Sequence, residues 1–277
     1  MFKSVGIVAR YDKKQALHLV EELAEYLKNK NLQVYIEDTL EGKISEHEFI
    51  PLAQMKTDFI ITIGGDGTIL RAAIALPKPE PPILAINMGV RGFLTEVEPS
   101  QAEAAVEKCL RGEFKIEKCC KLAASTAGCV LPDALNDIVV STEEPVKVLY
   151  TQIFRDNKLI LKCQADGLIL SSQTGSTGYS LSAGGPILDP HVDAFVLTPI
   201  CALTVLRSIV FPANTKVTIQ AIRPDNMLVI VDGNHRQLIT TKNPTLTVTR
   251  SEKVSSFIRF KDDFYDRLQN RVLFKGM

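Results

Sequence analysis

The chain has 277 residues, which suits two domains, because a single hydrophobic core stops growing near roughly 250 residues. Hydrophobic residues make up 45% of the chain and charged residues 23%, the proportions of an ordinary globular protein. Its 32 basic and 32 acidic residues cancel, so no basic excess indicates nucleic acid or an anionic membrane as the main partner.

Six scattered cysteines form no C-x-x-C pair, which argues against a structural zinc site and favours reduced thiols in the cytoplasm. The N-terminus lacks the apolar core and the small-residue cleavage site of a signal peptide. The longest apolar stretch, Ala194–Leu206, contains Thr198, Pro199 and Thr204 and is too short and broken to span a bilayer. We therefore expect a cytoplasmic protein without a membrane partner.

The first part of the chain alternates between strand and helix patterns, which predicts a parallel sheet covered by helices on both faces. Ser100 is the expected N-cap of the last helix, with Glu103 as its capping-box partner and Gly112 just past its end. The expected strands are Ser4–Ala9, Leu32–Glu37, Phe59–Ile63 and Ile83–Asn87, and the expected helices are Gln15–Lys30, Ile69–Leu76 and Ser100–Arg111.

After about Glu113 the pattern changes to short strands joined by turns, which predicts an antiparallel β-sandwich. A final helix, Asp263–Phe274, is expected to return to the first domain. The predicted domains are therefore a Rossmann-like α/β domain at 1–114, a β-sandwich at 115–260 and a returning segment at 261–277. The expected strands are Lys115–Ser125, Ala134–Ser141, Val146–Arg155, Leu159–Cys163, Leu168–Ser171, Phe195–Pro199, Lys216–Ile222, Met227–Val231, Gln237–Thr240, Thr245–Thr249 and Ser256–Phe260.

The most informative motif is GGDGT at 64–68, which follows the buried strand Phe59–Ile63. Its glycines tolerate positive φ and let a ligand approach the backbone closely. A carboxylate held in such a turn can accept a proton from a hydroxyl or help to hold a metal, so the motif suggests phosphoryl transfer to an alcohol. The alternative is an ordinary βα turn in which Asp66 only caps the following helix.

Two further motifs follow in the chain. NMGVRGFLT at 87–95 ends another parallel strand, and ligands of open α/β sheets bind outside the carboxyl ends of strands. ALNDIVV at 134–140 sets Asn136 and Asp137 among apolar residues, where both side chains need hydrogen-bond partners. The pair suits an amide plus a ribose or an amine, although a strand-entry Asx turn would also explain it.

The third stretch, ADGLILSSQTGSTGYSLSAGGP at 165–186, gathers Gly, Ser and Thr around Tyr179. Backbone amides and hydroxyls of such a loop can cradle phosphate oxygens, and the tyrosine can stack on a base. Ser/Gly-rich stretches are usually flexible linkers. This one carries few charges and follows a strand pattern, which favours a buried site loop.

Together with the later VDG at 231–233, these motifs resemble those of the NAD kinase family. They occur in the family's order and span residues 64–233. GGDGT alone also occurs in diacylglycerol and sphingosine kinases, whereas the stretch at 174–186 is much more specific. The resemblance implies transfer of the γ-phosphoryl group of ATP, or of inorganic polyphosphate, to the adenosine 2′-hydroxyl of NAD. It also implies Mg²⁺ or another divalent cation, and homodimers or homotetramers. Nucleic acid is not an expected partner.

The resemblance identifies Asp66 as the catalytic residue that receives or orients the 2′-hydroxyl proton. The glycine-rich turn is expected to bind phosphate through Gly64, Gly65, Gly67 and Thr68, and the metal ligands stay open. The expected NAD contacts are Asp66, Gly67, Arg71, Asn136, Asp137, Asp166, Thr174, Thr177, Gly178, Tyr179, Ser180, Leu181 and Ser182.

The chain departs from the family where many members carry a Pro-His-x-Leu-Ser-x-Arg-Pro segment. Residues 200–208 read ICALTVLRS, so the His is missing and Ser208 replaces the second Pro. Two alternatives stay open at this point. A lipid or sphingoid-base kinase would share GGDGT, and a non-catalytic NAD(P)-binding sensor would share the binding loops.

Overall fold

The computed structural model of the chain describes residues 2–89, 92–144, 147–203, 206–261 and 264–269. These residues form two units, each with its own hydrophobic core. The first unit comprises Met1–Lys118 with Ser255–Met277, and the second comprises Cys119–Val254. Two long strands, β6 (Lys115–Ser125) and β16 (Thr245–Arg259), each begin in one unit and end in the other.

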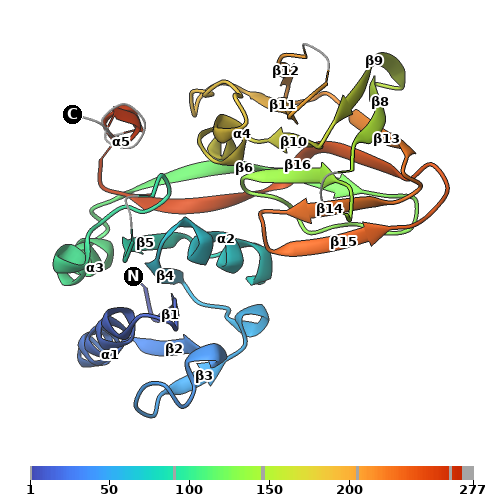
Figure 1. The fold of residues 1–277 in the computed structure, drawn as a ribbon. Helices are drawn as coiled ribbons and strands as arrows, with labels where there is room; N and C mark the ends of the chain where they lie inside the picture. The colour runs from blue at the N-terminus through green and yellow to red at the C-terminus, as the bar shows by residue number, and fades with distance from the viewer. Residues whose placement is uncertain (1, 90–91, 145–146, 204–205, 262–263, 270–277) are drawn as a thin grey trace. The chain divides into compact units, whose positions relative to one another are not determined.

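The first unit contains a parallel sheet in the order β3-β2-β1-β4-β5 (Figure 1). The end of β16 continues it, with Phe257 opposite Ile83 of β5. From β1 the chain adds β2 and β3 on one side of the sheet and then β4 and β5 on the other, so a topological switch point lies between β1 and β4. Ligands of open α/β sheets bind at such a switch point. The strands are β1 (Ser4–Ala9), β2 (Gln33–Glu37), β3 (Glu48–Ile50), β4 (Phe59–Gly64) and β5 (Ile83–Asn87).

Three helices accompany this sheet. Apolar residues of α1 (Lys14–Asn29) and α3 (Ala102–Arg111) share one core with alternate residues of the strands, such as Ile7. Successive strand residues point to opposite faces. The helix α2 (Asp66–Ala75) contacts β1 and β4, but its buried residues do not belong to that core. It therefore covers the opposite face of the sheet.

The second unit is an antiparallel sandwich whose two layers meet in one core. One layer has the order β12-β11-β10-β7-β14-β15, and the other pairs β16 with β6 and β13, β13 with β8, and β8 with β9. The strands not yet given are β7 (Asp137–Ser141), β8 (Leu149–Arg155), β9 (Lys158–Ala165), β10 (Gly167–Ser171), β11 (Ala194–Ile200), β12 (Ile209–Pro212), β13 (Val217–Arg223), β14 (Met227–Val231) and β15 (His235–Ile239).

The predicted fold class, an α/β part followed by an antiparallel sandwich, is confirmed. The returning helix is described only as α5 (Phe264–Leu268), and much of the predicted 263–274 lies outside the described residues. The Phe264 ring lies 6.3 Å from that of Phe93, centroid to centroid, and Arg267 Nη1 lies 3.9 Å from the Glu96 carboxylate. The chain therefore ends its described part on the first unit.

Several local predictions are wrong. Ser100 does not cap α3, because a 3-10 turn at Pro99–Gln101 precedes the helix and Gln101 is its N-cap. Gly112 does end the helix in a left-handed conformation, with φ of 74°. The short strand β3 was not predicted, and the two strands expected at 245–249 and 256–260 are one continuous strand, β16.

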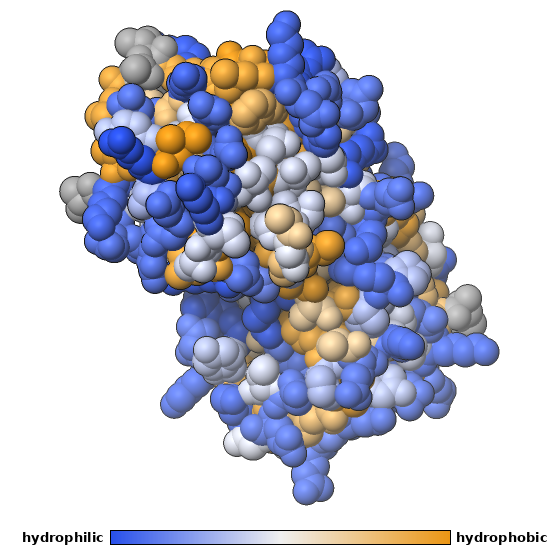
Figure 2. Space-filling view, turned by 90° about the vertical axis from the view of Figure 1, so that its right-hand side faces the viewer, coloured by the Kyte–Doolittle hydropathy of each residue, from blue (hydrophilic) through white to orange (hydrophobic). Residues whose placement is uncertain are grey.

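The surface drawn in Figure 2 is mostly hydrophilic, with hydrophobic residues gathered in patches. Among the described residues, the most exposed large apolar side chains are Val130 and Leu203, at 81% and 65%. Among the helices in the described part of the chain, none is long and apolar enough to cross a membrane. All six cysteines are free thiols.

Candidate active site

Asp66 lies at the carboxyl end of β4, in the first turn of α2, and is half-buried. Its carboxylate accepts hydrogen bonds from the backbone N–H groups of Phe93 and Leu94, at 3.0 and 3.2 Å. Gly65, not Asp66, is the N-cap of α2, so the interpretation of Asp66 as an ordinary helix cap is wrong. The carboxylate is instead bound to the loop that follows β5.

Two glycines make this arrangement sterically possible. A Cβ atom at Gly92 would lie 2.0 Å from Asp66 Oδ1, and one at Gly64 would lie 2.2 Å from Thr68 Oγ1. Gly92 therefore lets the loop approach the carboxylate, and Gly64 makes room for the buried Thr68 side chain. A Cβ at Gly65 or Gly67 would meet no atom within 4 Å, which leaves the backbone there open to a ligand.

Arg71, an expected ligand contact, binds a buried carboxylate. Its guanidinium donates to both Glu37 oxygens, at 2.5 and 2.8 Å, and to the Ala9 carbonyl at 3.2 Å. Glu37 is fully buried and also accepts from the Ala9 N–H at 2.7 Å. The hydrogen bonds to Glu37 raise the pKa of Arg71. Arg71 thus joins α2 to the carboxyl ends of β1 and β2.

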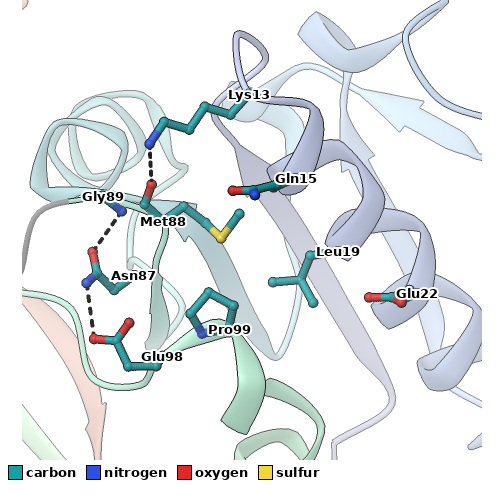
Figure 3. Close-up of a pocket in the computed structure, with 9 residues that line it drawn as sticks. All are labelled: Lys13, Gln15, Leu19, Glu22, Asn87, Met88, Gly89, Glu98 and Pro99. Carbon is teal, nitrogen blue, oxygen red and sulfur yellow. Dashed lines mark hydrogen bonds between the residues drawn. The ribbon is translucent and has the colours of Figure 1, made fainter.

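A pocket of about 740 Å³ opens in the same unit, beside the segment after β5 (Figure 3). Several of its polar groups bind one another: Lys13 Nζ donates to the Met88 carbonyl at 2.8 Å, and Asn87 Nδ2 donates to Glu98 at 3.3 Å. The Asn87 side chain also accepts from the Gly89 N–H. The pocket is lined by Lys13, Gln15, Leu19, Glu22, Asn87, Met88, Gly89, Glu98 and Pro99.

In the second unit, the backbone that leads into β7 is bound to the carboxylate of Asp232. Leu135 N–H donates to Oδ2 at 2.7 Å, while the N–H groups of Asn136 and Asp137 donate to Oδ1 at 2.8 and 3.0 Å. Asp232 N–H in turn donates to the Asp137 carbonyl at 2.9 Å. Because these N–H groups face Asp232, β7 begins at Asp137 and not at Ala134 as predicted.

Serines hold the carbonyls of the same segment. Ser172 Oγ donates to the Leu135 carbonyl at 2.5 Å, and Ser172 N–H donates to the Asn136 carbonyl at 2.9 Å. A Cβ at Gly175 would lie 2.0 Å from the Asn136 carbonyl oxygen, so the loop approaches closely only because this residue is glycine. Asn136 Oδ1 is buried and has no hydrogen-bond partner within the described residues. It is an acceptor available to a ligand.

Asp137 and Asp232 form a buried pair of acids, exposed by 6% and 4%. Burial, and then the nearby Asp232 charge, raises the pKa of Asp137 to about 7. Burial also raises the pKa of Asp232, while the three N–H donors and the fully buried Lys121 oppose that rise. Because donors favour the anion, we assign the negative charge to Asp232 and the proton to Asp137.

The serine- and threonine-rich loop folds into a 3-10 turn at Thr174–Thr177 and a single helical turn, α4 (Tyr179–Ser182). Buried hydroxyls hold the loop: Thr177 Oγ1 donates to the Thr174 carbonyl, and Ser180 Oγ bonds to Thr198 Oγ1 at 2.9 Å. Other members are less enclosed: Tyr179 is 48% exposed and Ser182 is exposed, while Gly178 and Leu181 are half-buried.

The structure brings this loop together with Asn136 and Asp137, because both adjoin Ser171 at the end of β10. It does not bring Asp166 to them. Asp166 is exposed and precedes Gly167, the other end of β10, whose register partner is Ser141. Four residue steps along β10 separate its two ends by roughly 13 Å.

The sequence interpretation missed two charged groups in this unit, the side chains of Lys121 and Asp232. VDG contributed to the resemblance, but no role followed for Asp232. The sequence pattern around Lys121 could have indicated it, since this lysine stands among apolar residues inside the predicted strand Lys115–Ser125. It is 1% exposed, and lysine is almost never fully buried unless it is paired.

The segment 200–208, which departs from the family pattern, begins at the last residue of β11. Cys201 is exposed with φ of 47°, and Leu203 N–H donates to the Gln164 carbonyl at 2.9 Å. Ser208 Oγ donates to Thr198 Oγ1 at 3.2 Å. Residues 204–205, like 90–91 of the NMGVRGFLT motif, lie outside the described residues.

The sequence of the chain is similar to those of known proteins. Residues 5–114 match the family model described as ATP-NAD kinase N-terminal domain, and 135–260 match that described as ATP-NAD kinase C-terminal domain. The NAD kinase of Methanothermobacter thermautotrophicus is 35% identical over 277 residues, which cover 99% of this chain and 97% of that protein.

Two solved structures are similar to the whole chain. An NAD kinase from Archaeoglobus fulgidus in complex with ATP has a TM-score of 0.80 at 27% identity, covering 96% of this chain and 97% of that one. Yeast NADH kinase complexed with NADH has a TM-score of 0.89 at 22% identity, covering 99% of this chain and 89% of that one. The yeast likeness concerns the fold alone.

Proposed function

The chain belongs to the NAD kinase family, and we propose that it transfers the γ-phosphoryl group of ATP to the adenosine 2′-hydroxyl of NAD, giving NADP. It is an enzyme that phosphorylates NAD. The observation that carries the proposed mechanism is the Asp66 carboxylate, which the N–H groups of Phe93 and Leu94 fix at the carboxyl end of β4. ATP as the donor is supported by the Archaeoglobus fulgidus relative, which was solved with ATP.

The proposed role of Asp66 is to accept the 2′-hydroxyl proton or to orient that hydroxyl. Phosphoryl transfer depends mainly on positioning and charge stabilisation, so Asp66 need not be a strong base. An ionised carboxylate is an acceptor with about four lone-pair sites, which suits it to receive a hydroxyl proton. The open backbone at Gly65 and Gly67 supports the proposal that phosphate oxygens bind at this turn.

The proposed adenosine contacts belong to the second unit. The unpartnered Asn136 Oδ1 can accept an N–H of the base, and a protonated Asp137 can donate to a ribose hydroxyl. Tyr179 is exposed enough to offer its ring to a base. The buried Thr177 and Ser180 hold the loop, so their expected NAD contacts would involve the backbone. Contacts of Arg71 and Asp166 with NAD stay predictions.

A divalent cation, Mg²⁺, completes the proposal. Within the described residues, no group of three or more His, Cys, Asp and Glu side chains could hold a metal ion alone. Mg²⁺ commonly keeps several waters and binds one or two carboxylates with substrate phosphates, a donor set that a single carboxylate such as Asp66 fits. The ion would neutralise charge on the phosphoryl group. Activity should therefore vanish with EDTA and return with excess Mg²⁺.

Self-association to a dimer or tetramer and a cytoplasmic location are also proposals. Exposed apolar side chains such as Val130 and Leu203, and the hydrophobic patches in Figure 2, support self-association. Six free thiols agree with a reducing compartment. Sedimentation of the purified protein over a range of concentrations would measure its oligomeric state.

A donor and acceptor panel tests the function. Purified protein is mixed with NAD or NADH, with ATP or inorganic polyphosphate, and with Mg²⁺, and the product is measured by an NADP-specific dehydrogenase. We expect NADP from NAD and ATP. Failure of every donor to give NADP, with the protein folded by circular dichroism, would contradict the proposal. Phosphorylated diacylglycerol or sphingosine in a parallel assay would support the lipid-kinase alternative.

A further inference from the structure

Asp232 occupies a turn that fixes the direction of its side chain. Asp232 and Gly233 have φ of 48° and 68°, and Asn234 N–H donates to the Val231 carbonyl at 3.0 Å. Two successive left-handed residues with this hydrogen bond make a type I′ turn, which joins β14 to β15. Because β14 pairs with β7, the turn lies beside the start of β7, where Asn136 and Asp137 stand.

The carboxylate of Asp232 binds three successive N–H groups of that segment, and Asp232 N–H binds its last carbonyl. Ser171 and Ser172 bind the carbonyls of Leu135 and Asn136 on the other side. The backbone that carries Asn136 and Asp137 is therefore held by hydrogen bonds on both sides. The Asn136 and Asp137 side chains accept no hydrogen bond from the described residues, which leaves them available to a ligand.

The charge of Asp232 is essential to this arrangement. Three N–H groups converge on two oxygens, and only an ionised carboxylate offers acceptors alone. Lys121 is 1% exposed and attracts the Asp232 carboxylate electrostatically. A buried carboxylate with three N–H donors and a buried cation is a compensated charge, which the protein interior tolerates.

We propose that Asp232 is a positioning residue for the dinucleotide: as a carboxylate it aligns the backbone of 135–137 so that Asn136 and Asp137 face the adenosine of NAD. Lys121 keeps that carboxylate charged. The inference rests on the proposed function for the identity of the ligand. The alignment of the segment stands on the hydrogen bonds of this chain alone.

The substitution Asp232→Asn tests the inference, because asparagine also tolerates the left-handed turn conformation but replaces one acceptor oxygen by an NH2 group. We expect the KM for NAD to rise about tenfold or more, the factor that the loss of one hydrogen bond to a charged group gives. The KM for ATP should stay within about twofold. A loss caused only by a damaged fold would lower the amount of active enzyme without separating the two KM values.

The chain offers a matched control in Asp156→Asn. Asp156 also occupies a hairpin turn with φ of 47°, its carboxylate accepts the Lys216 N–H at 3.1 Å, and its own N–H donates to the Lys216 carbonyl. It belongs to the β8–β9 hairpin, and no NAD contact is assigned there. We expect Asp156→Asn to leave both KM values unchanged. Equal KM values for NAD in wild type and Asp232→Asn would overturn the inference.

Hydrogen exchange of the unmodified protein gives a second measurement that needs no variant and no NAD. The amides of Leu135, Asn136 and Asp137 should exchange as slowly as those of the β7 core, because each donates to Asp232. Fast exchange, at the rate of exposed loop amides, would refute the alignment. If these amides are protected but the wild type makes no NADP with any donor, the proposed function fails while the alignment by Asp232 stands.

Discussion

Asp66 in the first unit and Asp137 in the second are held in opposite ways. The half-buried Asp66 carboxylate receives two N–H donors from the loop after β5. Asp137 is 6% exposed, its carboxyl has no hydrogen bond within the described residues, and burial beside Asp232 raises its pKa to about 7. The difference teaches that hydrogen bonds fix one acid in place, while burial makes the other able to carry a proton near neutral pH.

The largest expected effect is a loss of stability at a third carboxylate, Glu37, which the Arg71 guanidinium binds. Arg71→Met would leave the fully buried Glu37 charge without its partner, so we expect the free energy of unfolding to fall by about 3 kcal/mol. Chemical denaturation measures this loss. Arg10→Met is the control, because its partner Asp12 is exposed and the pair should contribute nothing measurable.

The outcome also separates two roles of Arg71. A stable Arg71→Met protein with a raised KM for NAD would show that the arginine acts on the ligand, as the sequence predicted, and not on Glu37. A double variant, Arg71→Met with Glu37→Gln, should recover part of the lost stability, because it removes the uncompensated charge.

A methyl group at Gly92 should displace the Asp66 carboxylate, the one that hydrogen bonds hold in place. Gly92→Ala would place Cβ 2.0 Å from Asp66 Oδ1, so the carboxylate must move and lose its N–H donors. We expect kcat to fall about 10²-fold, as misplacement of a catalytic group by about 1 Å can cost. Gly128→Ala, where Cβ meets no atom within 4 Å, is the matched control. Unchanged kcat in Gly92→Ala would mean that the position of Asp66 does not limit catalysis.

A pH series should show the proton on Asp137. Its pKa is raised from 3.8 to about 7, so between these values the folded protein binds more protons than the unfolded chain. Its contribution therefore lowers stability as pH rises from about 4 to 7, and the full cost remains above pH 7. We expect Asp137→Asn to stabilise the protein by on the order of 2 kcal/mol at pH 8, and little at pH 4.

Denaturation midpoints of both proteins from pH 4 to 8 check this prediction. A constant difference across the series would contradict it, since a group that does not titrate there contributes equally at every pH. The same series with NAD present would show whether affinity follows the proton on Asp137.

The sequence predicted most of the fold because its information is local. The amphipathic helix Gln15–Lys30 follows from its periodicity, and the buried strand Phe59–Ile63 follows from a short apolar run that glycines end. The strand Glu48–Ile50 escaped because it has three residues and no buried one. Helix capping at Ser100 failed because a 3-10 turn starting at Pro99 replaced the expected cap.

The site was predictable by residue type but not by contact. GGDGT identified Asp66, yet nothing local indicates that its carboxylate binds a loop 27 residues away. Asp232 lies 96 residues from Asn136, and Arg71 lies 34 residues from Glu37. Tertiary packing alone brings such groups together, so the sequence assigned Arg71 to a ligand and gave Asp232 no role.

In the proposed reaction, Asp66 is the residue that acts on the accepting 2′-hydroxyl group. The decisive measurement is the rate of NADP formation by Asp66→Asn at saturating NAD, ATP and Mg²⁺, together with the dissociation constant of NAD. We predict that kcat falls by about 10² or more, as for loss of a positioned general base, while the NAD dissociation constant changes little. A variant that forms NADP as fast as the wild type would contradict a catalytic role for Asp66.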